Sequence, residues 1–298
     1  MKWLPIFIFL LFGCSTTKKA NTENLAVPTP QLVFTITEGI AHPESVLYSQ
    51  AHGAIFVSNV ASGNPVETKA LGNISKYDRD GKVISSPWVK GLKAPKGMTL
   101  VGNTLYVSDV NQVVKIDIKK AKILQAIKIP GAKFLNDVVA DKKGNIYISD
   151  MMTDTIHIWN KSGVKVWKQT PDLRSPNGLY TDGSEHILMV SWGNPIAKNF
   201  STENPGALSM LSLKNSEKPF EETESLQGNL DGIAADNQGN LWISDWMNGD
   251  IYRVRKNGSA QKVFNLNQGA ADLSFSKELN LLLVPQMNES KVMAYKID

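Results

Sequence analysis

The chain has 298 residues, of which 42% are hydrophobic, and a formal net charge of +4. This length and apolar content suit two domains or one large all-β domain with a substantial core. Lys and Arg are scattered along the sequence rather than banded, which argues against a nucleic-acid partner. A single cysteine excludes an intrachain disulfide, so the fold must depend on its core alone.

The N-terminus differs from the rest of the chain. An apolar run, Trp3 to Phe12, follows Lys2; it is too short to cross a bilayer and is typical of the core of a signal peptide. It leads into Leu11-Phe12-Gly13-Cys14, which resembles a bacterial lipobox, whose cysteine is lipidated and becomes the first residue of the mature chain. The polar stretch from Ser15 to Pro30 suits a flexible tether.

These features predict three regions. We expect a lipoprotein signal peptide at residues 1–13, the lipidated Cys14 and its tether at residues 14–30, and one folded domain at residues 31–298. Such a chain is exported and lies on the periplasmic or cell-surface side of a membrane, which it contacts only through the lipid at Cys14. A serine after the cysteine resembles the pattern sorted to the outer membrane in double-membrane bacteria.

A repeat of about 40 residues organises the folded domain. Each copy opens with a short apolar strand, followed by a polar turn and two alternating strands, with Gly and Asn at the turns. This period, with three or four short strands per copy, is typical of a β-propeller blade. The six copies open at Glu44, Lys96, Asn136, Asn177, Asp231 and Ala271.

The chain ends after the third strand of the sixth copy, so that blade lacks one strand. The segment from Leu32 to Ile36 precedes the first copy and can supply it. Pairing of the two chain ends would close the ring and remove both exposed sheet edges. We therefore predict an all-β, six-bladed β-propeller closed by an N-terminal strand that completes the last blade.

Copies one and four are longer than the others. Their insertions, Asn59 to Gly72 and Trp192 to Gly206, both follow the second strand and both contain Gly-Asn-Pro. In a six-fold ring these copies lie opposite each other, and loops after second strands emerge at the end where first strands begin. The insertions should therefore flank one mouth of the central channel.

The opening residues should converge on the axis, because the first strand of each propeller blade is innermost. Two carboxylates (Glu44 and Asp231) and two carboxamides (Asn136 and Asn177) would then meet at one end of the channel. Hard oxygen donors of this kind are the ligands that Ca²⁺ prefers. A single Asn-Gly or Asp-Gly pair is normally a turn, but four donors in one register favour a metal or polar ligand site.

A second recurring residue is the Asp at the end of second strands. It occurs as Asp109, Asp150 and Asp245, with Asn59 in the first copy. Its presence irrespective of blade indicates turn capping, so we interpret these residues as structural.

The opening segments resemble those of the SMP-30/gluconolactonase family of six-bladed propellers and, more distantly, the paraoxonases. The similar stretches begin with Pro43-Glu44-Ser45-Val46 and continue with Leu135-Asn136-Asp137, Pro176-Asn177-Gly178 and Leu230-Asp231-Gly232. The resemblance covers residues 32–298. It implies that Glu44, Asn177 and Asp231 bind a divalent metal, usually calcium, that Asn136 contacts substrate or metal, and that the substrate is a lactone or related ester.

Two positions depart from the family pattern. Phe134 stands where sugar lactonases tend to have Arg, which argues against an aldonolactone substrate. Lys96 stands where the paraoxonases carry a histidine; it could contact a substrate carboxylate or a developing oxyanion, or form a salt bridge with Glu44 or Asp231. As a mechanism, Ca²⁺ would polarise the lactone carbonyl, and Asp231 or Glu44 would activate water.

The remaining predictions concern the substrate and the alternatives. Lys96 and Asn136 would orient the substrate, and Phe134, Trp192, Trp246 and Met247 would contact it. The alternative is a non-enzymatic binding propeller of the NHL type, in which the ion is structural and one face binds a protein or glycan. A serine hydrolase is disfavoured, because no G-x-S-x-G motif is present and the four histidines have no evident nucleophile partner.

Overall fold

Short antiparallel strands make up almost all of the described chain. The computed structural model describes residues 30–183 and 185–297, whose only helices are two 3-10 turns, η1 (Gln50–His52) and η2 (Pro171–Leu173). No helix in this part of the chain is long and apolar enough to span a membrane. The predicted signal peptide and Cys14 fall at residues 1–29, outside the described residues.

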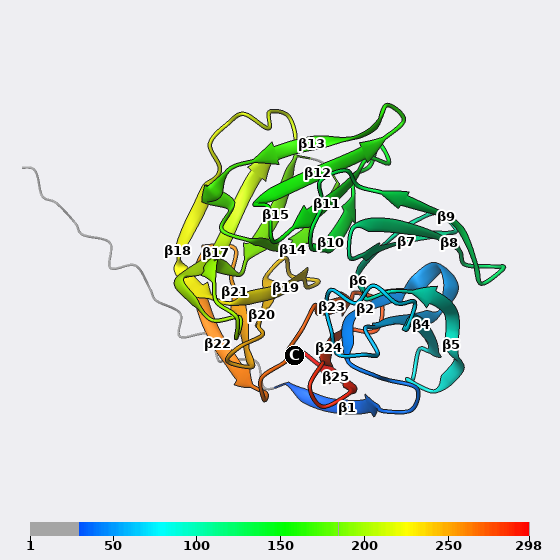
Figure 1. Cartoon of the computed structure of the whole chain (residues 1–298). Coiled ribbons are helices and arrows are strands. Elements are labelled where there is room, and N and C mark those ends of the chain that lie inside the picture. Colours follow the sequence, from blue (N-terminus) through cyan, green and yellow to red (C-terminus); the bar gives the residue numbers. More distant parts are fainter. Residues whose placement is uncertain (1–29, 184, 298) are drawn as a thin grey trace, which may run out of the picture.

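The strands form six sheets around a common axis, which is a six-bladed β-propeller (Figure 1). Within blades 1 to 3, consecutive strands are neighbours from the axis outward. Blade 1 contains β2 (Pro43–Ser49), β3 (Ala54–Asn59), β4 (Gly72–Asp78) and β5 (Val83–Leu92). Blade 2 contains β6 (Pro95–Val101), β7 (Thr104–Asp109), β8 (Gln112–Asp117) and β9 (Lys122–Lys128). Blade 3 contains β10 (Leu135–Ala140), β11 (Ile146–Asp150), β12 (Thr155–Asn160) and β13 (Gly163–Gln169).

Of the other three blades, blade 5 has the same order, blade 4 has an extra hairpin strand, and blade 6 is made from both chain ends. Blade 4 contains β14 (Pro176–Tyr180), β15 (His186–Ser191), β16 (Gly193–Ile196), β17 (Thr202–Ser212) and β18 (Glu221–Gly228). Blade 5 contains β19 (Leu230–Ala235), β20 (Leu241–Asp245), β21 (Asp250–Val254) and β22 (Ala260–Asn265). Blade 6 contains β23 (Ser274–Ser276), β24 (Leu281–Gln286), β25 (Lys291–Lys296) and β1 (Gln31–Ile36).

The predicted ring closure is confirmed. Strand β1 pairs antiparallel with β25, from Gln31 opposite Lys296 to Ile36 opposite Val292. In Figure 1 the blue β1 lies along the red β25. The sixth blade therefore has four strands, three from the C-terminus and one from the N-terminus.

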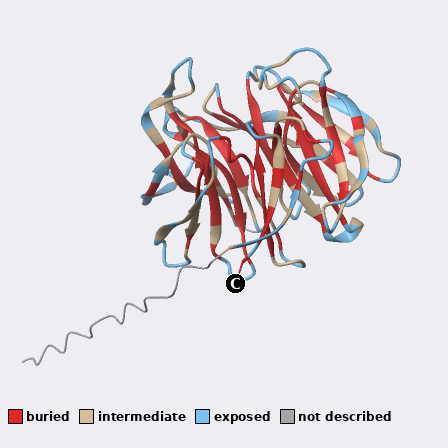
Figure 2. Ribbon diagram, turned by 90° about the horizontal axis from the view of Figure 1, so that it is seen from below, coloured by how far each residue is buried: buried red, intermediate tan, exposed pale blue. Residues whose placement is uncertain are grey.

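Apolar side chains hold the blades together. Strand residues alternate between the two faces of a sheet, and the buried ones gather into six clusters, one at each junction between adjacent blades. At the junction of blades 1 and 2, for example, Phe56 packs with Leu105 and Val107. Figure 2 shows buried residues along the middle of the strands and exposed residues mainly in the loops at the two faces. This even packing fixes the position of each innermost strand.

Two ends of the channel can be distinguished. We call mouth the end at which the first strands begin, where the turn after β24 (residues 287–290) lies, and base the opposite end, where Gln31 and Lys296 pair. The two predicted insertions lie at the mouth. Residues 60–71 connect β3 to β4 without a strand, whereas the second insertion, predicted as a loop, forms a hairpin in which β16 pairs with the start of β17.

Candidate metal centre and active site

The six opening residues lie together at the axis and are buried. Each is at most 5% exposed: Glu44, Lys96, Asn136, Asn177, Asp231 and Ala271. They converge because each stands at the start of an innermost strand, or just before it in blade 6. The backbone permits this crowding because small residues follow several of them. A Cβ added at Gly178 would clash with the carbonyl oxygen of Asp231.

Three buried oxygens in this ring have no hydrogen-bond partner. They are Oε2 of Glu44, Oδ1 of Asn177 and Oδ1 of Asp231. The amide nitrogen of Asn177 donates to the carbonyl of Leu230 over 3.0 Å, which leaves its oxygen free for another group. Buried polar atoms are normally paired, so three orphaned acceptors in one ring indicate a missing donor or cation.

This donor set fits a hard divalent cation such as Ca²⁺. Two carboxylates and one carboxamide supply oxygen only, which suits calcium and leaves room for water in its coordination sphere. The described residues contain no group of three or more His, Cys, Asp and Glu that could hold an ion, so a metal here would need the amide oxygen of Asn177. The structure thus places together the three residues predicted to hold the metal, with Asn136 in the same ring.

The electrostatics of the ring fit a site for a cation. Burial, followed by repulsion from Asp231 and Asp272, raises the pKa of Glu44 well above its usual value. Burial, followed by repulsion from Asp272 and Asp245, raises the pKa of Asp231 in the same way. A bound divalent cation would reverse both shifts, because it favours the charged form of each carboxyl group.

Lys96 is the one cationic side chain in the ring. Burial lowers its pKa to about 8, although Glu44 and Asp109 oppose that shift. Its ammonium group donates to the carbonyl of Ala94 over 3.1 Å and lies 4.6 Å from the centre of the Phe134 ring. The salt bridge considered from the sequence is not formed, since no ion pair of Lys96 occurs within the described chain.

Serines at the ends of second strands position the opening residues, a role that the sequence analysis missed. The hydroxyl of Ser149 in blade 3 donates to the carbonyl of Asn177 in blade 4 over 2.7 Å. Ser244 in blade 5 donates to the carbonyl of Ala271 over 2.8 Å, and Ser108 in blade 2 donates to the carbonyl of Asn136. Each bond ties one blade to the first residue of the next. The recurring Ser-Asp pair was the available signal, but only its Asp was interpreted.

The capping prediction for the second-strand Asp residues is confirmed in blades 2 and 3. Asp109 accepts hydrogen bonds from the backbone amides of Lys93 and Ala94, and Asp150 accepts them from Lys133 and Phe134. These amides stand two or three residues before Lys96 and Asn136. The carboxylates therefore fix the turns from which the opening residues enter the ring.

A small apolar cavity lies over the ring at the mouth. Its volume is about 240 Å³, and Glu44, Lys96, Asn136 and Asp231 form part of its lining. Both insertions contribute to it, the first through Gly63 and Pro65 and the second through Trp192 and Phe200, as their predicted position at one mouth requires. The predicted substrate contacts Phe134, Trp192 and Trp246 also line the cavity.

The cavity wall is a connected aromatic cluster. The rings of Trp192 and Trp246 lie 5.9 Å apart, and Phe200 meets Trp192 edge-on at 6.3 Å. The indole nitrogen of Trp192 donates to the carbonyl of Phe200 over 2.9 Å, so the hairpin fixes the ring. Met247 packs against this cluster but is absent from the cavity lining, which differs from its predicted role.

The cavity also contains residues that sequence reasoning did not find. His42, Met151, Phe200, Met287 and Asn288 line it. Nδ1 of His42 lies 3.2 Å from the carbonyl of Ala61 and must donate, because a carbonyl oxygen only accepts. His42 stands two residues before Glu44, and this closeness to an opening residue could have indicated it from the sequence. The repeat contains no such indication for the other four residues.

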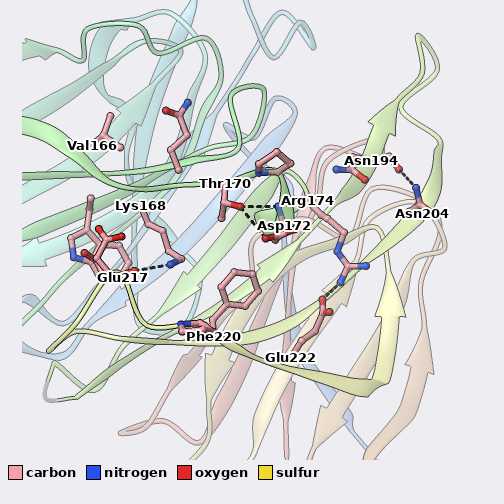
Figure 3. A pocket seen from close by; sticks show the side chains of 15 residues that line it. Val166, Lys168, Thr170, Asp172, Arg174, Asn194, Asn204, Glu217, Phe220 and Glu222 are labelled. Carbon is pink, nitrogen blue, oxygen red and sulfur yellow. Dashed lines mark hydrogen bonds and ion pairs between the residues drawn. The ribbon is translucent and has the colours of Figure 1, made fainter.

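A larger cavity lies away from the ring of opening residues. It measures about 1080 Å³ and lies beside β13 and the residues that precede β18 (Figure 3). Both of its cationic side chains are engaged: Arg174 pairs with Glu222, and Lys168 donates to the carbonyl of Ser216 over 2.6 Å. None of the six opening residues lines it. We therefore assign the functional site to the smaller cavity at the mouth.

The fold and the ring define a class of protein, the six-bladed propellers with a buried, oxygen-rich centre at one mouth. Residues 42–284 match the family model of the SMP-30/gluconolactonase/LRE-like region. The chain therefore belongs to the SMP-30/gluconolactonase/LRE-like family, which confirms the resemblance seen in its opening segments. No curated protein sequence matches the chain.

Solved structures share the fold at low sequence identity. A gluconolactonase from Xanthomonas campestris superposes with a TM-score of 0.68 at 12% identity, covering 92% of this chain and 96% of that one. A catalytically inactive virginiamycin B lyase from Staphylococcus aureus, solved with quinupristin, superposes with a TM-score of 0.61 at 12% identity, covering 91% and 100%. At these identities the likeness shows the common fold alone.

Proposed function

We propose that the protein is a calcium-dependent hydrolase of lactones or related esters. The observation that carries the proposal is the set of three unpartnered buried oxygens, on Glu44, Asn177 and Asp231, directly below an apolar cavity in a member of this family. A ligand ring without a cavity would suit a structural ion, and a cavity without the ring would suit a simple binding site. Their combination favours hydrolysis.

The residues of the ring would have different roles in binding and catalysis. Glu44, Asn177 and Asp231 would hold the ion, with Asn136 beside it. When bound there, Ca²⁺ supplies a Lewis acid that polarises an ester carbonyl. A carboxylate oxygen of Asp231 or Glu44 accepts the proton of the attacking water. The ammonium group of Lys96 and the amide of Asn136 orient the ester and favour negative charge on its carbonyl oxygen.

The cavity indicates small, apolar substrates. Its 240 Å³ is below the range of about 300–1,000 Å³ typical of pockets for drug-sized ligands. Aromatic and thioether side chains form most of the upper wall, which offers few partners for the hydroxyls of a sugar lactone. The Phe134 ring lies against Lys96, whereas an arginine in place of Phe134 would suit a polar substrate. Aliphatic or aryl lactones therefore fit better than aldonolactones.

The test is a lactone panel with the purified protein. Aliphatic, aryl and sugar lactones are assayed with calcium and with chelator, and thermal unfolding is followed in parallel. We expect calcium-dependent turnover that is lost in Asp231→Ala together with the thermal shift, and kept in Asp80→Ala, which alters an exposed turn. Unchanged turnover in Asp231→Ala would sink the mechanism, whereas a thermal shift without any turnover would favour the non-enzymatic binding propeller.

We also propose that the protein is exported and anchored as a lipoprotein through Cys14. The support is the lipobox-like tetrapeptide that ends at the only cysteine of the chain. Mass spectrometry of the protein from membranes should find lipid on an N-terminal Cys14, and Cys14→Ser should move it out of the membrane fraction. An unmodified, full-length N-terminus would contradict the proposal.

A further inference from the structure

The base of the propeller is the face from which the N-terminal segment leaves the fold. Strand β1 runs from Gln31 at the base to Ile36 at the mouth side, because Gln31 pairs with Lys296 and Ile36 with Val292. The turn after β24, which includes Met287 and Asn288, reaches the mouth cavity at the other end. In Figure 2 the C-terminal end of the chain lies at the lower face of the propeller, which is the base.

Lysines that are scattered in the sequence gather on this face. The turns at the base join first to second strands in every blade and third to fourth strands in blades 1 to 5. Nine exposed lysines stand in these turns and form no ion pair within the described residues: Lys82, Lys119, Lys120, Lys142, Lys143, Lys161, Lys218, Lys256 and Lys277.

The acidic side chains do not balance this charge. The same turns contain five exposed acids: Asp80, Asp182, Glu185, Glu217 and Glu278. Two of them already form ion pairs, Glu185 with Lys214 and Glu278 with Arg79. The turns at the mouth lack this excess of lysine, and one of their acids, Glu289, is paired with Lys291. The exposed charged side chains of the mouth insertions and turns are Lys69, Lys133 and Lys198 against Glu38, Asp172, Glu203 and Glu289.

We propose that the base is a docking surface for an anionic membrane, so that the mouth opens away from the lipid. Unpaired lysines on one face are attracted to the negative potential of anionic headgroups, within about one Debye length of the surface. The chain that precedes β1 enters the fold on this same face, so an anchor at its far end holds the base toward the bilayer. The docking adds a second, electrostatic contact to the lipid proposed at Cys14 and does not require it.

The orientation has a consequence for the site. The cavity over Glu44 and Asp231 then faces the aqueous side, and its apolar wall receives soluble small molecules rather than molecules that diffuse within the bilayer. The hairpin of β16 and β17, with its aromatic side chains, likewise stays clear of the lipid.

The experiment compares a fluorophore at the base with one at the mouth. Cys14 is the only cysteine, so a lipidated chain has no other thiol, and Cys14→Ser serves where lipid is absent. Ser162→Cys places a label at the base and Ser62→Cys places one at the mouth; both serines are exposed. The full chain is mixed with vesicles containing nitroxide headgroup lipids, either neutral or with about one third anionic phosphatidylglycerol.

We expect the base label to be quenched at least twofold more than the mouth label, only on anionic vesicles, and less at high salt. Charge reversal of Lys120, Lys142 and Lys143 to Glu should lower vesicle affinity about 100-fold or more, because each of the three lysines contributes roughly 1 kcal/mol and a tenfold change is about 1.4 kcal/mol. The matched reversal of Lys69, Lys133 and Lys198 at the mouth should change it little. Equal quenching of both labels, no dependence on anionic lipid, or tight binding to nucleic acid without quenching overturns the proposal.

Discussion

At the scale of single residues, the side chain at the opening position changes from blade to blade while the surrounding backbone repeats. Glu44, Asn177 and Asp231 occupy equivalent places yet differ in side chain, and each keeps one unpartnered oxygen. The repeated backbone of the blade therefore places the opening residue, and the side chain at that position can vary. The predictions at this scale concern the donors and the buried acids around them.

Asn177→Ala removes an uncharged donor. The variant loses Oδ1 and the bond from Nδ2 to the carbonyl of Leu230. We expect calcium affinity to fall by at least roughly 10-fold, because the loss of an outer-shell partner alone typically lowers metal affinity by about 10- to 100-fold and Asn177 would be a direct ligand. Terbium luminescence or calorimetry measures this, with the exposed Asn257→Ala as control. Equal affinity in both variants would exclude Asn177 from the ligand set.

Asp272 predicts a pH dependence of stability. Burial raises its pKa to about 7, a shift that the hydrogen bond from the Ser45 hydroxyl reduces. The folded protein therefore holds this proton more tightly than the unfolded chain, whose Asp titrates near about 3.9. The stabilising contribution is present below about pH 4 and is lost as the pH rises to about 7.

The measurement is urea unfolding with chelator across pH 4 to 8. We expect the free energy of unfolding to fall over that range, and Asp272→Asn to recover roughly 1–3 kcal/mol at pH 8. Other buried acids, including Asp137, whose pKa burial also raises, will keep part of the slope. If wild type and variant follow the same curve, Asp272 does not titrate as its surroundings require.

The donors were predictable from sequence and the residues around them were not. Glu44, Asn177 and Asp231 stand at fixed places in a visible repeat, so their convergence follows from the propeller alone. His42 and Phe200 reach the cavity through turn and hairpin geometry, which the repeat does not encode. Asp137 and Asp272 follow opening residues by one position and were overlooked, because one blade in isolation does not show that they face the same channel.

At the scale of elements, bonds between neighbouring blades hold the ring in register. The hydroxyl of Ser149 accepts from the amide of Asp137 within its own blade and donates to the carbonyl of Asn177 in the next. Both contacts are buried. One side chain thus couples the second strand of blade 3 to two opening segments.

Ser149→Ala should lower the free energy of unfolding by roughly 1–3 kcal/mol, because it leaves a buried amide and a buried carbonyl without a partner. Calcium affinity should fall as well, since the backbone of Asn177 is no longer fixed. Chemical denaturation and calcium titration measure the two effects, with the exposed Ser162→Ala as control. A loss no larger than that of the control would argue against the bridging role.

The hairpin of β16 and β17 forms one wall of the cavity. Phe200→Ala removes a ring that packs against Trp192, while the carbonyl that holds the indole nitrogen stays. We expect KM for apolar lactones to rise about five- to tenfold, with kcat little changed, as for the loss of apolar binding area. Leu124→Ala, on the outer strand β9, is the control. A fall in kcat at constant KM would give Phe200 another role.

Strands were predicted better than this insertion. Second and third strands alternate apolar and polar residues, which fixes their type and face. The segment from Trp192 to Gly206 lacks such alternation and contains Pro195 and Pro205, which do not favour strands. It forms β16 and the start of β17 because each supplies the backbone partners of the other.

At the scale of the whole molecule, closure of the ring depends on a strand far away in sequence. Ile36 of β1 is buried in the cluster between blades 6 and 1, whereas Leu32 of the same strand is 53% exposed. Ile36→Ala should cost roughly 2–4 kcal/mol of unfolding free energy, and Leu32→Ala close to none. Thermal and urea unfolding of the pair measure this. Similar costs for both would show that β1 contributes through its backbone alone.

The position of β1 also sets how the molecule responds to mechanical force. Any pull on the segment that precedes β1 enters the fold at Gln31 and is borne first by the hydrogen bonds between β1 and β25. Because β1 also closes the ring, its detachment under load would open blade 6 before the other five blades are disturbed. Because Ala271 and Asp272 lead into that blade and contact the Glu44 segment, tension would disturb the proposed metal site early. A propeller held in this way would lose its activity under strain before it unfolds.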